Sequence, residues 1–258
     1  MDEGGGENFD VNFMKGRRDM KNMVAGSIAE FVGTFTLMFA GGGAIIMTAA
    51  MPGGGGGLLA VALAHGLALA VMISATMHIS GGQLNPAVTF GVFVGGKQGL
   101  GKSIVFVISQ VLGSVVAAFI LKSAFGSVHA AGGDGLAVEA AKLGATLGGM
   151  GLGTGVIYLL EVIATFFLVF TVFGTAVDQR GVGKGPMVGG FAIGLTVMMD
   201  ILMIGPATGA SMNPARSFGP ALVGGYWDIQ WLYWLAPLTG GLLAALVWRF
   251  GIGLGDEG

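Results

Sequence analysis

Apolar runs long enough to cross a lipid bilayer dominate this sequence of 258 residues. A helix needs about 20 predominantly apolar residues to cross the hydrocarbon core. The runs are separated by a Pro-Gly stretch at 52–57, a loop at 126–153 and a charged turn at 178–184. The pattern predicts six transmembrane helices, at about 24–50, 58–79, 103–125, 155–177, 187–205 and 230–250.

Two further apolar stretches, at about 85–94 and 213–223, are too short to cross. A helix of about 10 residues spans about 15 Å, half of the hydrocarbon thickness. Segments of this kind are re-entrant, and they are tolerated only inside protein or beside a water-filled cavity. The predicted fold is therefore an all-α membrane protein with six transmembrane helices plus two re-entrant half-helices.

Composition agrees with a membrane location. Hydrophobic residues make up 53% of the chain and charged residues 10%, whereas a soluble domain carries roughly 25% charge. The net charge of −2 provides no electrostatic footprint for nucleic acid. The absence of Cys excludes a disulfide scaffold, a cysteine-ligated zinc site and a thiol nucleophile.

The positions of the basic residues predict the orientation in the membrane, because cytoplasmic loops carry an excess of Lys and Arg. We expect a disordered cytoplasmic tail at 1–22, a single transmembrane domain at 23–250 and a short cytoplasmic tail at 251–258. The cell membrane is the favoured residence. Nine of the twelve basic residues fall on the side of the two termini: Lys15, Arg17, Arg18, Lys21, Lys97, Lys102, Arg180, Lys184 and Arg249.

The chain also repeats itself. GGQLNPAVTFG at 81–91 matches GASMNPARSFG at 209–219, with an offset of 128 between the two Asn residues. AEFVGTF at 29–35 recurs as LEVIATF at 160–166, and SQVLGSVVAAF at 109–119 recurs as APLTGGLLAAL at 236–246. Each half, about 24–125 and 155–250, contains three spans, so the second copy must insert upside down. Such inverted repeats hold their binding or passage site near the bilayer midplane.

Each short segment begins with the tripeptide Asn-Pro-Ala, at Asn85, Pro86, Ala87 and again at Asn213, Pro214, Ala215. Asn as the N-cap followed by Pro is a favourable helix start. In an inverted repeat the two helix N-termini face each other, and each carries about half a positive charge. Their Asn side chains add N–H donors that would orient a passing water and repel cations. The chain contains only five Asn, and two of them begin matched tripeptides in the two halves. This coincidence argues against their being ordinary helix caps.

These motifs, SGGQLNPAVTFG and GASMNPARSFGPA, resemble those of the aquaporins, the major intrinsic protein family, and the likeness extends over about residues 24–250. The resemblance implies one water pore in each protomer of a homotetramer embedded in the lipid bilayer. We expect no enzymatic activity, cofactor or metal.

The same resemblance assigns a selectivity filter to His65, Ile201, Ala210 and Arg216. This set is similar to that of the tonoplast intrinsic subfamily, whose ring is wider and less polar than that of a strict water channel. Ammonia, urea, glycerol and hydrogen peroxide then become candidate passengers beside water. Ser217 and Ala221 depart from the pattern of a dedicated glycerol facilitator.

Three acidic residues lie within the predicted spans. The resemblance assigns Glu30 and Glu161 to bracing the re-entrant loops, whereas Asp200 stands where the tonoplast pattern has Asn. Two alternative functions remain at this stage. One is an ammonia, urea or glycerol facilitator; the other is a secondary transporter, because inverted repeats also occur in that class. The spans contain no nucleophile–base pair and no metal-ligand cluster, which argues against an enzyme.

Overall fold

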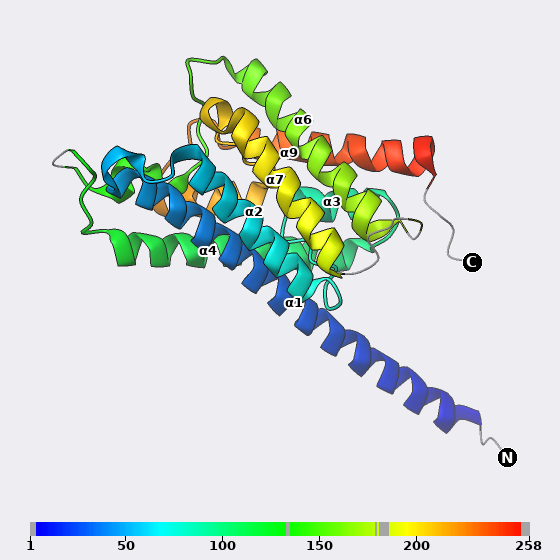
Figure 1. Cartoon of the computed structure of the whole chain (residues 1–258). Coiled ribbons are helices and arrows are strands. Elements are labelled where there is room, and N and C mark those ends of the chain that lie inside the picture. Colours follow the sequence, from blue (N-terminus) through cyan, green and yellow to red (C-terminus); the bar gives the residue numbers. More distant parts are fainter. Residues whose placement is uncertain (1–3, 133–134, 179, 181–185, 254–258) are drawn as a thin grey trace.

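The computed structural model describes residues 4–132, 135–178, 180 and 186–253, and within them the regular elements are helical. Six helices form a tilted bundle (Figure 1). Their bounds are α1 (Gly4–Ala50), α2 (Gly57–Thr76), α4 (Leu100–Phe125), α6 (Thr154–Val172), α7 (Pro186–Thr208) and α9 (Leu232–Leu246). Two π-helical segments, η3 (Phe173–Val177) and η4 (Val247–Ile252), extend α6 and α9. The shorter elements are α3 (Pro86–Val94), α5 (Ala137–Ala140), α8 (Pro214–Gly224), η1 (Pro52–Gly54) and η2 (Lys142–Gly144).

The six predicted spans are confirmed. Within the described residues the helices that are long and apolar enough to cross a membrane cover 19–50, 57–76, 100–125, 154–177, 188–208 and 232–252. The two short stretches form α3 and α8 within a residue or two of the predicted limits. The start of α1 and the end of η4 lie toward the same end of the bundle (Figure 1).

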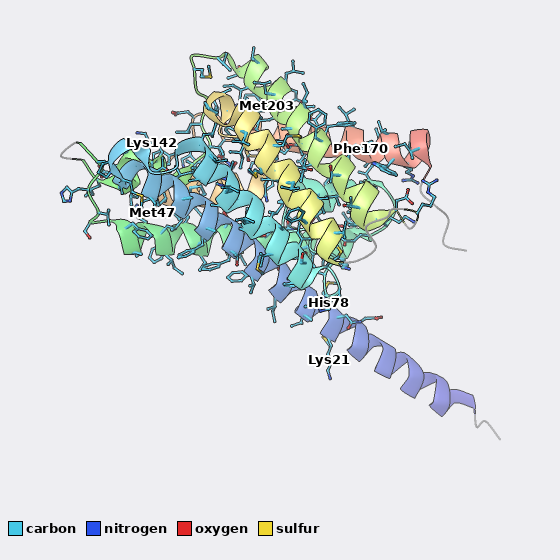
Figure 2. The ribbon with its side chains drawn as sticks, viewed as in Figure 1. Lys21, Met47, His78, Lys142, Phe170 and Met203 are labelled. Carbon is cyan, nitrogen blue, oxygen red and sulfur yellow. The ribbon has the colours of Figure 1, made fainter. Side chains whose placement is uncertain are left out.

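The outer surface of the bundle carries large apolar side chains. Met203, Phe119 and Phe191 are more than half exposed, and side chains project outward around the helices (Figure 2). Lys21 and His78 lie at one end of the bundle, whereas Met47 and Lys142 lie at the other (Figure 2). An apolar belt with polar ends is the surface that a bilayer requires.

Glycines allow equivalent helices of the two halves to approach closely. A Cβ on Gly66 of α2 would lie 2.7 Å from the Gly194 carbonyl oxygen of α7, and one on Gly194 would lie 2.4 Å from that of Gly66. These two residues are 128 positions apart, the offset of the Asn-Pro-Ala motifs. Small residues at helix crossings are typical of membrane bundles, where packing rather than water drives association.

The contacts of the third spans repeat in the same way. A Cβ on Gly113 of α4 would lie 2.4 Å from the Phe31 carbonyl oxygen of α1. One on Gly240 of α9 would lie 2.4 Å from the Val162 carbonyl oxygen of α6. Phe31 and Val162 are 131 positions apart, the offset between the two Glu residues. The sequence repeat therefore corresponds to a repeat of helix–helix contacts.

The N-terminal segment differs from the expectation. A disordered tail is predicted over 1–22, whereas α1 is one continuous helix from Gly4. No Pro occurs between Gly4 and Ala50, so nothing in this stretch removes a helical hydrogen bond and stops the span from continuing outward. Residues 1–3 and 254–258, and with them most of the predicted C-terminal tail, lie outside the described residues, as do Asp134 and Lys184.

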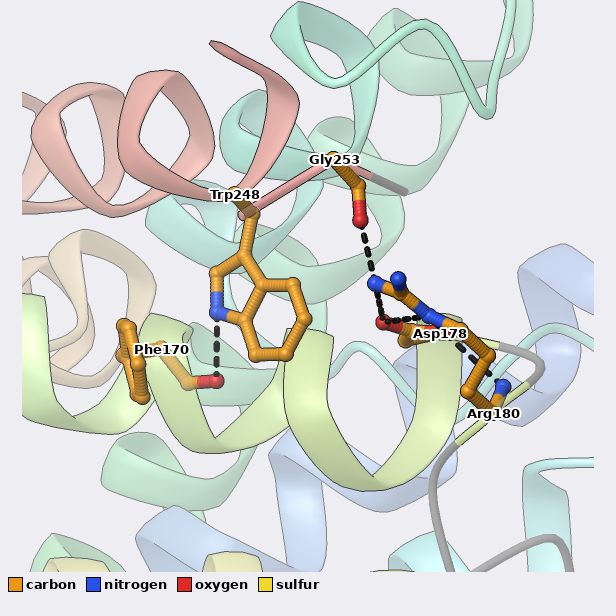
Figure 3. Close-up of polar contacts among 5 residues, drawn as sticks. All are labelled: Phe170, Asp178, Arg180, Trp248 and Gly253. Atoms are coloured by element: carbon orange, nitrogen blue, oxygen red, sulfur yellow. Dashed lines mark hydrogen bonds and ion pairs between the residues drawn. The ribbon is translucent and has the colours of Figure 1, made fainter. Parts of the chain in front are cut away.

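The loop after α6 is tied to the end of the last helix. The Arg180 guanidinium forms an ion pair with Asp178 at 2.6 Å and donates to the Gly253 carbonyl oxygen (Figure 3). Nearby, the Trp248 indole N–H donates to the Phe170 carbonyl oxygen at 3.1 Å (Figure 3). The ends of α6 and α9, which belong to the same half, are thereby joined at one end of the bundle.

Candidate pore

Both half-helices begin at the predicted Asn residues. The Asn85 side-chain oxygen accepts from the Ala87 backbone N–H at 2.8 Å, which caps α3. The Asn213 oxygen accepts from the backbone N–H groups of Ala215 and Arg216, both at 3.1 Å, which caps α8. In each helix Pro occupies the first turn, where no N–H is needed.

The two Asn side chains also bind the opposite half of the molecule. The Asn85 amide donates to the Met212 carbonyl oxygen at 2.8 Å, and the Asn213 amide donates to the Leu84 carbonyl oxygen at 2.9 Å. Each bond joins one Asn to the residue that precedes the other. A side-chain amide carries two N–H groups, so each Asn keeps one donor after this bond. The half-helix N-termini therefore face each other.

The backbone leading to each Asn follows the same unusual path in both halves. Three positions in each copy adopt positive φ angles, a conformation that is uncommon for residues other than Gly. In the second copy one of these positions is Ala210, where the first copy has Gly. The equivalent pairs are Gly81 and Gly209 (φ 100° and 86°), Gly82 and Ala210 (60° and 45°), and Leu84 and Met212 (52° and 51°).

A buried carboxylate holds each of these loops. Glu30 is fully buried, and it accepts from the Gln83 and Leu84 backbone N–H groups at 3.0 and 2.5 Å and from the Ser80 hydroxyl at 2.6 Å. The Gln110 side-chain amide donates to Glu30 at 2.7 Å. These donors satisfy a charge that would otherwise be costly to bury.

Glu161 repeats this arrangement in the second half. It is fully buried, and it accepts from the Ser211 and Met212 backbone N–H groups, both at 2.9 Å, and from the Thr208 hydroxyl at 2.7 Å. Pro237 stands where the repeat places Gln110, and among the described residues Glu161 accepts from three donors rather than four. Both Glu residues therefore accept hydrogen bonds from the loop that precedes the Asn of their own half.

His65 of α2 and Arg216 of α8 meet directly. Arg216 Nη2 lies 3.0 Å from His65 Nε2, and His65 Nδ1 lies 2.8 Å from the Val61 carbonyl oxygen. Arg can only donate and a carbonyl can only accept. Both contacts are therefore satisfied when the His65 proton resides on Nδ1 and the Nε2 lone pair accepts from Arg216.

The loop between α4 and α6 completes the surroundings of Arg216. Arg216 Nη1 donates to the Gly144 carbonyl oxygen at 2.6 Å. Thr146 shares a hydrogen bond of 2.6 Å with Ser217, the next residue of α8. The Arg216 Nε group is buried and has no hydrogen-bond partner in the part of the chain that the structure describes. Sequence reasoning treated this loop only as a break between spans, because one Gly and one Thr in a Gly-rich stretch give no signal.

Two cavities adjoin the His65–Arg216 contact, and we call this place the junction. The outer one has a volume of about 350 Å³, and Ile201 is among its lining residues. The inner one has a volume of about 20 Å³, and Ala210, Asn85 and Asn213 are among its lining residues. Both are lined by His65 and Arg216. The four predicted filter residues thus lie around one junction, with Ile201 on its outer side and Ala210 on its inner side.

Gly41 of α1 makes room for the His65 ring. A Cβ at this position would lie 2.2 Å from His65 Nε2 and 2.4 Å from Cδ2. No side chain larger than hydrogen fits while His65 keeps its place. Gly41 is a second residue that sequence reasoning missed, since three consecutive Gly residues occur here and nothing distinguishes the first of them.

Asp200 is the unexplained acidic residue of the spans. It is fully buried, and neither side-chain oxygen has a hydrogen-bond partner among the described residues. The neighbouring Ile201 lines the outer cavity, whereas Asp200 is enclosed between helices of its own protomer.

The comparisons with known proteins identify the family. The family model for the major intrinsic protein matches residues 18–248. The chain is 41% identical to the probable aquaporin TIP-type alpha of Phaseolus vulgaris, over 88% of this chain and 84% of that protein. It is 46% identical to aquaporin TIP4-4 of Zea mays, over 86% and 84% of the two chains.

The chain therefore belongs to the major intrinsic protein family, whose members are membrane channels for water and small neutral solutes. Within that family it is similar to the TIP-type aquaporins. Its fold matches that of the aquaglyceroporin from Plasmodium falciparum, with a TM-score of 0.77 at 24% sequence identity, over 89% of this chain and 97% of that one. That likeness concerns the fold alone.

Proposed function

We propose that this protein is a passive water channel whose pore passes between Asn85 and Asn213 and then between His65, Ile201, Ala210 and Arg216. The observation that carries the proposal is the inner cavity, which is lined by both Asn residues and by Arg216. Its volume of about 20 Å³ suits one water, which needs roughly 10–15 Å³.

The lining of this cavity is mostly apolar, so it binds a water only weakly. Leu37, Leu69, Leu168 and Val197 contribute apolar walls. The free amide hydrogens of Asn85 and Asn213 supply donors at one level, so a water there turns its oxygen toward them and its hydrogens away along the path. Because few polar groups bind the water, little energy is needed for it to leave.

Cations and protons meet two barriers along this path. The facing N-termini of α3 and α8 each carry about half a positive charge. Arg216 adds a full charge beside the junction of the two cavities. Placing a cation in the first turn of α8 opposes the helix dipole by about 0.3–1 kcal/mol, and the Gly144 carbonyl that accepts from Arg216 offsets this cost.

Stopped-flow light scattering on proteoliposomes tests the proposal. We expect a fast, non-saturating water flux with a low activation energy, and no proton or cation conductance. A flux that saturates or requires an ion gradient would instead indicate a secondary transporter. Empty liposomes and an Asn85→Leu, Asn213→Leu double variant provide the controls.

A broader solute range is the second candidate function. Ile201 and Ala210 present an aliphatic chain and a methyl group at the junction. On their side the passage is therefore wide and its lining is weakly polar. Ammonia, urea, glycerol and hydrogen peroxide are the candidate passengers. Permeabilities measured side by side with water in the same vesicles would rank them, and flux of water alone would reject this candidate.

We further propose a homotetramer in the vacuolar membrane, with both termini in the cytoplasm. The vacuolar membrane replaces the cell membrane favoured from sequence, because the relatives are TIP-type. An apolar surface groove of about 900 Å³ between α2 and α7 offers a face for a neighbouring protomer. Imaging of a fluorescent fusion with a vacuolar marker tests the location, and native mass spectrometry tests the assembly.

A further inference from the structure

The far end of each half-helix is bound by a cation from the opposite half of the chain. Arg249 Nη1 in η4 donates to the Val94 carbonyl oxygen of α3 at 2.7 Å. Lys122 Nζ in the last turn of α4 donates to the Val223 carbonyl oxygen of α8 at 3.0 Å. Arg249 lies 127 positions after Lys122, the offset that relates the third spans of the two halves. The two contacts are therefore equivalent under the inverted repeat.

The chemistry of a helix C-terminus favours a cation at these positions. The last four carbonyl groups of a helix lack intrahelical partners, and that end carries about half a negative charge. At the end of α3 the carbonyl oxygens of Gly91, Val92 and Phe93 accept from the backbone N–H groups that follow the helix. Val94 comes next in the chain, and its carbonyl accepts from Arg249.

Each half-helix is consequently held at both ends by the other half. The N-terminal Asn85 of α3 binds the Met212 carbonyl, and its C-terminal carbonyl binds Arg249. For α8, Asn213 binds the Leu84 carbonyl, and the C-terminal Val223 carbonyl binds Lys122. A short helix that is fixed at one end alone can slide or tilt, which would change the spacing between the two Asn amides.

We propose that Arg249 and Lys122 are positioning residues of the pore: as a matched pair of cationic caps, they set the depth and tilt of α3 and α8 from opposite faces of the membrane. The inference deepens the proposed water-channel function and rests on it. It also gives a role to Lys122, which lies opposite the side where most basic residues gather. The competing explanation is that both side chains extend toward lipid headgroups, because both are exposed.

The test compares charge removal with charge conservation. Arg249→Gln and Lys122→Gln should each lower the water permeability per protein about two- to fivefold, the ratio that corresponds to a helix-end charge interaction. Arg249→Lys and Lys122→Arg should restore it. Lys102→Gln and Lys142→Gln are the matched controls, since these lysines lie over the rings of Phe106 and Tyr226 rather than at a half-helix end. Both controls should keep the wild-type permeability.

A distance measurement separates positioning from a surface-charge effect. Because the chain contains no Cys, spin labels can be attached to two introduced cysteines at exposed positions. Leu222→Cys with Phe119→Cys reports α8 against α4, and Lys97→Cys with Leu243→Cys reports the chain just after α3 against α9. Lys122→Gln should broaden only the first distance distribution. In the second pair, Arg249→Gln should broaden the distribution and Arg249→Lys should not.

Unchanged distance distributions in both Gln variants would overturn the proposal. Wild-type water permeability in both Gln variants would also overturn it. So would a loss of water permeability in the Lys102→Gln and Lys142→Gln controls that equals the loss in the Arg249→Gln and Lys122→Gln variants. The headgroup explanation predicts that last outcome. If wild-type vesicles conduct no water, the proposed function fails, whereas the spin-label distances still decide whether the caps position α3 and α8.

Discussion

Arg216 Nη2 donates to His65 Nε2 at 3.0 Å, and this hydrogen bond joins the second half-helix to the second span across the junction of the two cavities. The guanidinium is also held by the Gly144 carbonyl, so its position is determined from two sides. Its Nε group is buried and has no hydrogen-bond partner among the described residues. The contact joins two residues of the proposed selectivity filter, so a change at either one should affect the other.

Replacing Arg216 with Val should widen the selectivity of the channel. The substitution removes the charge and the donors at the junction and leaves space beside His65. We expect urea and glycerol permeability to rise relative to water, with a measurable cation leak, in stopped-flow and conductance assays on the same vesicles. Unchanged ratios between solutes would mean that Arg216 does not line the narrowest point.

Gly41→Ala should reduce water permeability through His65 without removing any polar group. The added Cβ would lie 2.2 Å from His65 Nε2, so the ring must leave its contact with Arg216. Gly43→Ala is the matched control, because among the described residues a Cβ there would contact the Leu121 side chain alone, at an ordinary 3.4 Å. If the two variants conduct water equally well, His65 is free to move and the proposed constraint is wrong.

Bulkier side chains at Ile201 and Ala210 should narrow the solute range. Ile201→Phe or Ala210→Thr fills the weakly polar side of the junction, which larger solutes need more than water does. We expect urea and ammonia permeability to fall by a larger factor than water permeability. An equal loss for every solute would reject the assignment of these residues to the filter.

Glu161→Gln should destabilise the protein. A neutral amide accepts on one atom only, so at least one of the donors from Thr208, Ser211 and Met212 loses its partner, at a cost of about 1–3 kcal/mol. Thermal unfolding in detergent measures the effect. Glu139→Gln, at an exposed position of the outer loop, should leave the unfolding temperature unchanged. Similar unfolding temperatures for both variants would contradict the bracing role.

Asp200→Asn should stabilise the protein and leave its water permeability unchanged. The Asp200 carboxyl group is fully buried without a partner among the described residues, and a neutral amide removes the cost of burying its charge. We expect the unfolding temperature to rise by about 2–4 °C for each kcal/mol gained. Asp228→Asn, at an exposed position, is the control. A lower unfolding temperature would show that Asp200 has a favourable partner.

The sequence predicts those features that depend on periodicity and duplication. Six apolar runs give the spans, and the repeated Asn-Pro-Ala motifs give α3 and α8 together with the facing of Asn85 and Asn213. The features that the sequence does not predict depend on contacts between residues that are far apart in the chain. Gly41 matters only because the His65 ring packs against it, and Gly144 matters only because its carbonyl points at Arg216. Neither relationship leaves a periodic signal in the chain.

In the amino-terminal segment, composition and structure differ. Its Gly-rich, charged composition favours disorder, but the helix of the first span continues back to Gly4 because no proline interrupts it. Composition describes the average tendency of a segment, whereas an existing helix removes the cost of nucleation for the residues that extend it.

The reciprocal bonds of Asn85 and Asn213 have a consequence for biosynthesis. The acceptor for Asn85 is Met212, which the ribosome adds 127 residues later, and Arg249 follows later still. When the amino-terminal three spans enter the membrane, their re-entrant segment therefore lacks both anchors. We therefore expect that neither half conducts water by itself and that water permeability arises only when the last span has been inserted.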